Sequence, residues 1–370
     1  MGETPVMPSV TVYCVNAFLL SLVLTLAMER IARRIGLVDV PTQRKNHEGQ
    51  VPLVGVAMFL AFGIASMLLQ RQPPGFAAFL LGLAFIVLIG VVDDLIDVRA
   101  PIKLIAQAVG VAMMVLPSDI VIQNIGNLVH GRPLLLLDWA VPATIFAVVG
   151  LINAINMVDG LDGLAGGVSL TALIWFAVAA GMIGSSDQLL LILVLVFSIL
   201  GFLVFNFRHP WRVRAAVFLG DGGSMMLGMA LSFVAISLSQ RHGPSLSPVA
   251  ALWICALPVI DTLSLMIRRI AAGQSALASD HRHLHHLLRR AGLTVNETVL
   301  ILVAANAVLG GIGIVGWSIG VPDGALLLGL TGPVIFHSWF SGYGWKHIRL
   351  SRDPFMGTEP TIGRPQPSTK

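Results

Sequence analysis

Residues 139–184 read WAVPATIFAVVGLINAINMVDGLDGLAGGVSLTALIWFAVAAGMIG. Two apolar runs, over 139–156 and 167–184, flank a short polar turn. Each run is close to the length of about 20 residues that a membrane-spanning helix needs. The stretch from Asn153 to Gly167 holds two amides, two carboxylates and four glycines. Because ionisable groups beside lipid are costly, we interpret these carboxylates as functional.

The same alternation of long apolar runs and short polar turns continues along the whole chain. Of 370 residues, 56% are hydrophobic, the mean hydropathy is +0.85, and only 23 Lys or Arg and 19 Asp or Glu are present. This composition is typical of a polytopic membrane protein. The sequence therefore predicts an all-α membrane helical bundle of about eleven transmembrane helices. The predicted spans are 9–28, 51–69, 75–92, 102–116, 139–156, 167–184, 189–206, 217–239, 247–267, 297–317 and 323–340.

The basic residues predict the orientation of these spans. With eleven spans, twenty of the 23 Lys and Arg residues fall on one side. Under the positive-inside rule that side is cytoplasmic, so the N-terminus is expected to be periplasmic and the C-terminus cytoplasmic. We expect residues 1–340 to form one transmembrane catalytic domain and 341–370 a flexible cytoplasmic tail. The predicted cytoplasmic active-site loops are 29–50, 93–103, 156–166, 207–217 and 268–296.

Four polar clusters fall on this predicted cytoplasmic face, although the Lys and Arg count alone determined the orientation. Their common side predicts a single active site. The clusters are Asp93-Asp94-Leu-Ile-Asp97, the stretch Asn153–Gly167, Phe218-Leu-Gly-Asp221-Gly-Gly-Ser224, and Asp280-His-Arg-His283-Leu-His285-His286.

The first two clusters have an ordinary interpretation as well as a functional one. Paired aspartates at a helix end are commonly solvated loop residues. If the helix continues, however, Asp93 and Asp97 share a face, and like charges at that spacing need a cation or a raised pKa. The three-residue spacing of Asn153, Asn156, Asp159 and Asp162 favours a polar wall along one side of a helical turn.

The other two clusters are suited to anions. The Gly-Asp-Gly-Gly-Ser stretch at 220–224 is either a turn or a helix N-terminus whose backbone N–H groups suit phosphate. The histidine run could bind a transition metal, but its cationic neighbours favour an anion. Since Asp and Asn oxygens suit Mg²⁺ shared with substrate phosphates, the four clusters together favour phosphoryl transfer. The competing class is a transporter, for which Asp261, inside a predicted span, is the one suitable carboxylate.

The chain resembles the polyprenyl-phosphate N-acetylhexosamine-1-phosphate transferases, and within them the bacterial enzymes that use undecaprenyl phosphate and UDP-GlcNAc. The resemblance covers about residues 39–293 and rests on several motifs in the same order. These are Asp39-x-Pro41-x-x-Arg44-Lys45-x-His47, Pro52-Leu-Val-Gly55, Asp93-Asp94-x-x-Asp97, Asn153-x-x-Asn156-x-x-Asp159-Gly-Leu-Asp162-Gly-Leu, Phe218-x-Gly-Asp221-x-Gly-Ser224, Pro258-x-x-Asp261, Arg268-Arg269 and His283-Leu-His285-His286.

The resemblance implies a reaction and its setting. Such enzymes transfer a sugar-1-phosphate from a UDP-sugar to undecaprenyl phosphate and release UMP, as the first membrane step of O-antigen, lipopolysaccharide or cell-wall glycans. It implies Mg²⁺ as cofactor, with Mn²⁺ as the alternative ion, and a multi-pass location in the bacterial inner membrane with the active site facing the cytoplasm. Expected partners are UDP-GlcNAc, undecaprenyl phosphate, membrane lipids and, as a compatible assembly, a second copy of the chain; no nucleic acid is expected.

The resemblance also implies roles for the individual residues. Asn156 and Asp221 correspond to Mg²⁺ ligands, and Asp93 and Asp94 to the pair that handles the lipid phosphate beside Lys103. Phe218 corresponds to a residue that stacks on uracil. The complete predicted site comprises Asp93, Asp94, Asp97, Asp159 and Asp162 as catalytic residues, Asn156 and Asp221 as metal ligands, and Lys45, Lys103, Asn153, Phe218, Arg282, His283, His285 and His286 as substrate-binding residues.

The sugar donor has alternatives. The His-Leu-His-His form argues against UDP-MurNAc-pentapeptide, the donor of the relative that makes the peptidoglycan precursor. Other UDP-N-acetyl sugars remain open.

Overall fold

The computed structural model describes residues 9–34, 55–129, 131–209, 211–212, 214–271, 273–274 and 282–348. Lys45, Asp280 and most of the predicted 29–50 loop lie outside these residues. Throughout the described part the regular structure is helical, with isolated β-bridges and no β-strand, which confirms the predicted all-α class. The helices are α1 Val10–Arg34, α2 Gly55–Met67, α3 Phe76–Ile96, α4 Ala100–Val115, η1 Leu137–Trp139, α5 Ala140–Val158, α6 Leu164–Met182, α7 Ser186–Asn206, α8 Gly220–Ser239, α9 Pro248–Ile254, α10 Ala256–Ala271, α11 Leu284–Arg290, α12 Val295–Ser318, α13 Asp323–Gly329 and α14 Thr331–His347.

Eight helical segments of the described chain are long and apolar enough to cross a membrane. They are α1, α3, α5 with η1, α6, α7, α8, α12 and α13 with α14. In lipid a helix satisfies all of its own backbone hydrogen bonds, which is why long apolar runs fold this way. The protein is therefore a multi-pass membrane protein. The helices α2 and α4, with 13 and 16 residues, overlap the predicted spans 51–69 and 102–116 and fall below this length.

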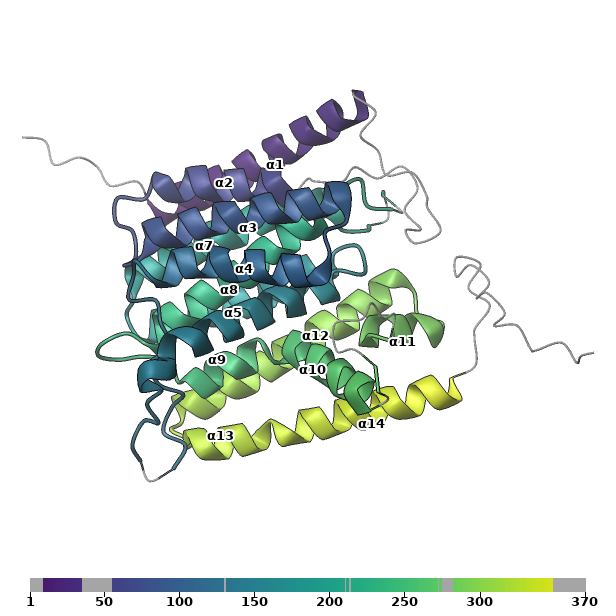
Figure 1. Ribbon diagram of the computed structural model, residues 1–370. Coiled ribbons are helices and arrows are strands. Elements are labelled where there is room, and N and C mark those ends of the chain that lie inside the picture. Colours follow the sequence, from purple (N-terminus) through teal and green to yellow (C-terminus); the bar gives the residue numbers. More distant parts are fainter. Residues whose placement is uncertain are drawn as a thin grey trace, which may run out of the picture.

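The predicted span 247–267 is two helices rather than one. Ser247 caps the N-terminus of α9 with its hydroxyl, and α9 ends at Ile254. The following helix, α10, continues at an angle of 80° to it. As Figure 1 shows, α10 lies with α11 toward the end of the bundle opposite α13.

The central helix of the bundle is α8. In the most apolar 18 residues of α8, 89% of the residues are buried inside the bundle, compared with 28% for the corresponding stretch of the peripheral α1. Glycines allow this close packing: a Cβ on Gly90 of α3 would lie 2.3 Å from the Cα of Gly222 in α8. Deeper in the core, the rings of Phe79 and Phe233 stack at 4.1 Å between the same two helices. Small residues at helix contacts let backbones approach, and here they hold α8 against the end of α3.

Three boundaries differ from the sequence predictions. The polar series at 153–162 does not lie on one helix, because α5 ends at Val158 and Asp159 is its C-cap. Similarly, α3 ends at Ile96, and Asp97 takes a left-handed conformation with φ of 53°. Residues 341–347, predicted as the start of a flexible tail, instead belong to α14, which continues to His347.

Candidate active site

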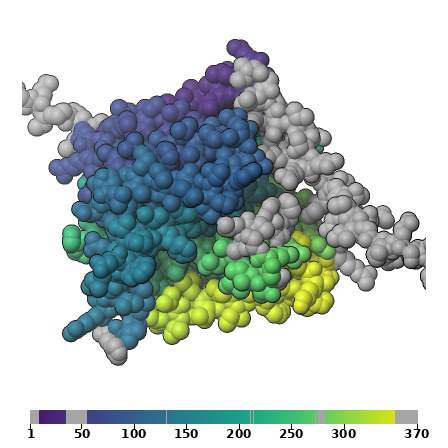
Figure 2. All heavy atoms as spheres, viewed as in Figure 1, coloured from purple at the N-terminus to yellow at the C-terminus, as the bar shows by residue number. Residues whose placement is uncertain are grey.

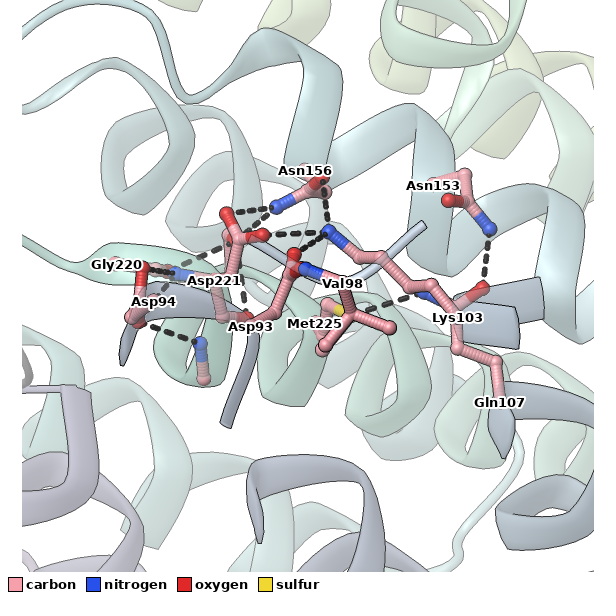
Figure 3. Close-up of polar contacts among 12 residues, drawn as sticks. Asp93, Asp94, Val98, Lys103, Gln107, Asn153, Asn156, Gly220, Asp221 and Met225 are labelled. Atoms are coloured by element: carbon pink, nitrogen blue, oxygen red, sulfur yellow. Dashed lines mark hydrogen bonds and ion pairs between the residues drawn. The ribbon is translucent and has the colours of Figure 1, made fainter. Parts of the chain in front are cut away.

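Side chains from four helices meet around the ammonium group of Lys103 (Figure 3). Its Nζ lies 2.5 Å from Asp93 Oδ2 and 2.5 Å from Asp221 Oδ2, and 3.5 Å from Asn156 Oδ1. These partners come from α3, α8 and α5, while Lys103 itself lies in the first turns of α4. The Lys103 side chain is only 14% exposed. The structure thus brings together four of the predicted site residues, although Lys103 and Asp221 alone lie 118 positions apart in the sequence.

The amide of Asn156 has a defined orientation in this cluster. Its Nδ2 donates to Asp221 Oδ1 at 2.8 Å and to Ser224 Oγ at 2.9 Å. The amide oxygen therefore faces Lys103, where it can accept a hydrogen bond or contact a cation. Ser224, which lies one turn into α8, was not predicted as a site residue.

Asp94 occupies the N-terminus of α8. Its carboxylate accepts hydrogen bonds from the backbone N–H of Asp221, at 3.0 and 3.1 Å, and of Gly222, at 3.5 Å. A helix N-terminus attracts negative charge, so this contact stabilises the ionised carboxylate. The interpretation of residues 220–224 as a free phosphate-binding terminus therefore needs correction. In this structure the anion at that terminus is a side chain of the protein.

A second polar layer lies one helical turn below the first. Asn153 Nδ2 donates to Gln107 Oε1 at 2.6 Å, and Gln107 Nε2 contacts Met225 Sδ at 2.9 Å. Gln107 is four residues after Lys103 and fully buried, and Met225 is four residues after Asp221. The layer joins three of the four helices that carry the first layer, namely α4, α5 and α8. Asn153, predicted to bind substrate, thus has its amide group directed at Gln107.

Asp159 and Asp162 lie beside this cluster, in the turn between α5 and α6. Burial raises the pKa of Asp159 well above its usual range, and the carboxylates of Asp221, Asp94 and Asp162 raise it further. Asp162 is buried and pairs with Arg208, whose Nε lies 2.6 Å from Asp162 Oδ2. The two carboxylates therefore have different environments, since within the described residues only Asp162 has a paired cation.

The remaining predicted residues near α3 and α8 lie at the edge of the cluster. Asp97 is exposed, and its backbone N–H donates to the Asp93 carbonyl at 2.9 Å. The left-handed conformation of Asp97 ends α3 and leaves the Val98 N–H to donate to Asp93 Oδ1 at 2.7 Å. Phe218 is half-buried, two residues before the first residue of α8.

The histidine segment, residues 282–286, packs against a buried carboxylate. His283 Nδ1 lies 2.8 Å from Asp261 Oδ2, and the Leu284 N–H donates to Asp261 Oδ1 at 3.1 Å. The rings of His285 and His286 lie 4.1 Å apart, and Arg282 is exposed. Asp261 entered the sequence analysis as a transporter-like carboxylate, but its partners place it next to the histidine motif.

The residues of the first layer fit a magnesium ion. Asp221 Oδ2 and Asn156 Oδ1 both face one positively charged group, the Lys103 ammonium. Mg²⁺ prefers such oxygens and is commonly held by one or two protein ligands together with substrate phosphates and water. Asp221 and Asn156 could therefore hold the ion with a diphosphate.

Comparison with known proteins places this site in a family. Glycosyl transferase family 4 matches residues 76–239, the segment from α3 to α8 that carries the Lys103 cluster. An undecaprenyl-phosphate alpha-N-acetylglucosaminyl 1-phosphate transferase of Yersinia pestis is 33% identical over 81% of this chain and 82% of its own. A transferase of the same name from Haemophilus influenzae is 32% identical over 94% of this chain and 97% of its own.

The chain belongs to this transferase family. The resemblance drawn from the motifs is thereby confirmed, and the protein is a membrane glycosyltransferase. The family match ends at residue 239, so the histidine segment and Asp261 lie beyond it. They remain within the longer similarity to the Haemophilus influenzae protein, which spans nearly the whole chain.

Proposed function

We propose that this protein transfers N-acetylglucosamine-1-phosphate from UDP-GlcNAc to undecaprenyl phosphate and releases UMP. An oxygen of the lipid phosphate attacks the sugar-bearing phosphorus of the donor. The bond from that phosphorus to the bridging oxygen breaks, and UMP leaves with that oxygen. The product is undecaprenyl-diphosphate-GlcNAc, which starts a cell-surface glycan. The names of the similar proteins support undecaprenyl phosphate as the acceptor and N-acetylglucosamine-1-phosphate as the transferred group.

The observation that carries the proposal is the position of Lys103 between Asp93 and Asp221. The nucleophile and the electrophile of this reaction are both anionic. The phosphate oxygen needs little activation, so the protein mainly has to position the groups and offset their charge. Lys103 supplies a fixed positive charge where the two anions would meet. Mg²⁺, held by Asp221 and Asn156, would neutralise charge on the donor diphosphate and on the leaving UMP.

The other residues would position the two substrates. We assign Asp93 and Asp94 to the lipid-phosphate side, where Asp93 holds Lys103 in place and Asp94 fixes the N-terminus of α8. Asp159, Phe218 and the histidine segment would line the nucleotide-sugar side. Because α8 carries Asp221 and is buried over most of its length, this arrangement is rigid before substrates bind.

A reconstituted assay tests the proposal. Purified protein should release UMP from UDP-GlcNAc only when undecaprenyl phosphate and Mg²⁺ are both present, whereas a transporter would release none. Including Mn²⁺, UDP-MurNAc-pentapeptide and other UDP-N-acetyl sugars defines the ion and the donor.

A substitution of the proposed metal ligand tests the role of the site itself. Asp221→Asn should reduce turnover by at least about 100-fold, because a charged ligand of the metal and a partner of Lys103 are lost together. The matched control is Asp187→Asn, a half-buried aspartate in the first turn of α7. Near-normal activity of a folded Asp221→Asn protein would remove the proposed metal role.

We also propose eleven membrane spans in the bacterial inner membrane, with the N-terminus periplasmic and the active site facing the cytoplasm. The alternation of helices that places the polar clusters at one end of the bundle supports this topology. Single cysteines at Ser118 and Gln274, in a background lacking the two buried native cysteines, provide the test. An impermeant maleimide should label position 118 in intact cells and position 274 only in inverted vesicles.

A further inference from the structure

Asp261 is a carboxylate in α10 that is almost completely buried, with 3% of the residue exposed. Three groups donate to it: His283 Nδ1 at 2.8 Å, the Leu284 N–H at 3.1 Å and His337 Nε2 at 3.0 Å. A charge in such surroundings is stable only when it is paired and hydrogen-bonded. The three groups come from two places in the chain: His283 and Leu284 lie at the N-terminus of α11, and His337 lies in α14.

The geometry determines which ring nitrogens carry protons. An ionised carboxylate only accepts hydrogen bonds, so His283 must donate through Nδ1 and His337 through Nε2. A histidine with one nitrogen committed in this way has a fixed tautomer and ring orientation. His337 is itself buried, and its Nδ1 makes no hydrogen bond with the part of the chain that the structure describes. Among the described residues, the hydrogen bond to Asp261 is therefore the polar contact that the His337 ring makes.

The histidine segment, residues 282–286, is held between this contact and the Lys103 cluster. On one side His283 and Leu284 are tied to Asp261. On the other side His285 packs on Gly160, where a Cβ would lie only 2.2 Å from His285 Nε2. Gly160 directly follows Asp159. If the histidine segment moved relative to Asp261, the turn that carries Asp159 would therefore move as well.

The last described helix completes this arrangement. Figure 2 shows the green surface of α10 lying directly against the yellow surface of α14, and α14 contacts both α10 and α11. His337 lies beyond residue 239, where the family match ends, and beyond the motifs that carry the sequence resemblance.

We propose that His337 is a positioning residue for the transfer reaction. Through Asp261 it fixes His283 and Leu284, and so it holds the histidine segment in place for the nucleotide-sugar donor. Loss of His337 would weaken binding of the nucleotide-sugar donor and lower the turnover rate, while the lipid acceptor would bind as before. This inference rests on the proposed function, which assigns the histidine segment to the donor side.

The test compares His337→Leu with His337→Gln in the reconstituted assay. Leu fills the space but cannot donate, whereas the Gln amide can place an N–H near the position of Nε2. We expect His337→Leu to raise the KM for UDP-GlcNAc about tenfold and to lower kcat, since displacement of a positioning group by a fraction of an ångström is costly. The KM for undecaprenyl phosphate should stay within about twofold. His337→Gln should recover most of the activity.

A double substitution separates positioning from general stabilisation. If His337 acts through Asp261 on His283, then adding His337→Leu to a His283→Ala protein should cause little further loss. Ser338→Ala is the matched control, because Ser338 Oγ lies 3.3 Å from Ser264 Oγ across the same contact between α10 and α14. Its kinetics should resemble those of the unmodified protein.

Several results would overturn the inference. One is a KM for UDP-GlcNAc that is unchanged in His337→Leu, and another is an effect of this substitution on the KM for undecaprenyl phosphate alone. A third is a loss of activity from His337→Leu that is as large in the His283→Ala protein as in the unmodified protein. Should His337→Leu fail to fold, His337→Asn replaces it: its shorter amide should raise the KM for UDP-GlcNAc more than Gln does, and equal values would contradict the proposal. If the unmodified protein releases no UMP from UDP-GlcNAc and undecaprenyl phosphate, the proposed function fails, whereas an active protein whose His337 variants behave normally defeats this inference alone.

Discussion

Replacing Lys103 by methionine removes the cation at the centre of the site while keeping the length of the side chain. Its Nζ contacts Asp93 and Asp221 at 2.5 Å each, and their side chains are 9% and 30% exposed. Removing one partner of a buried ion pair costs about 3–5 kcal/mol. Because Asp221 is partly solvated, we take the lower value of about 3 kcal/mol. Applied to the transition state, this corresponds to a loss of roughly 100-fold in kcat/KM.

The same substitution should have the opposite effect on magnesium. Lys103 and Mg²⁺ are attracted to the same oxygens of Asp221 and Asn156, and like charges a few ångströms apart oppose each other by about 1 kcal/mol or more even near solvent. Lys103→Met should therefore lower the Mg²⁺ concentration that gives half-maximal thermal stabilisation, by about tenfold. UMP release and melting curves over a Mg²⁺ series, both in detergent, measure the two effects on one preparation.

The two measurements together can refute this reasoning. If Lys103 instead holds Asp221 in the geometry that the metal needs, Lys103→Met will bind Mg²⁺ more weakly and lose activity. Activity within about threefold of the unmodified protein would equally contradict the assigned role. Lys103→Arg keeps the charge and should lose less activity, and Lys346→Met, at an exposed position of α14, controls for the loss of a lysine.

Three further outcomes concern stability. Because the pKa of Asp159 is raised, its protonation stabilises the folded protein at low pH, and this contribution is lost as the pH rises through the raised pKa. In EDTA at pH 8, Asp159→Asn should therefore melt at a higher temperature than the unmodified protein, and the difference should shrink on acidification. Gly90→Ala should destabilise by about 1–3 kcal/mol in chemical-unfolding titrations, since the added carbon would lie 2.3 Å from Gly222, while Gly150→Ala, which has open space, should not. Gln107→Leu leaves a neighbouring amide without its acceptor and should cost about 1–3 kcal/mol in the same titrations, whereas a change below 0.5 kcal/mol would show that this layer is not needed.

The local pattern predicted the helices and the identity of the central residues. Long apolar runs predicted every helical segment that is long enough to span a membrane, because a backbone in lipid must satisfy its own hydrogen bonds. The family resemblance of the motifs predicted Asn156 and Asp221 as site residues, and the structure places the two in hydrogen-bonding contact. Periodicity failed at Asp97 and Asp159, where the helices end: a helix end depends on capping contacts that an extrapolated spacing ignores.

Other parts of the site carried only weak signals. Gln107 is a polar residue four positions after Lys103 within an apolar run, a pattern that could have marked it as a member of the site. His337 has no comparable signal, because its partner Asp261 lies 76 residues away on another helix. Arg208 likewise pairs with Asp162 across 46 residues.

Composition and spacing alone determined that this chain is a helical membrane protein whose scarce charges lie at the ends of its apolar segments, since the cost of exposing polar backbone and charge to lipid acts residue by residue. Packing decided the rest. Close glycine contacts bring the N-terminus of α8 to Asp94 and bring α14 to Leu287 of α11. The packing of α3, α4 and α8 places Lys103 between two carboxylates. Such contacts depend on how close and at what angle helices approach, and that is set by the side chains of all the helices together.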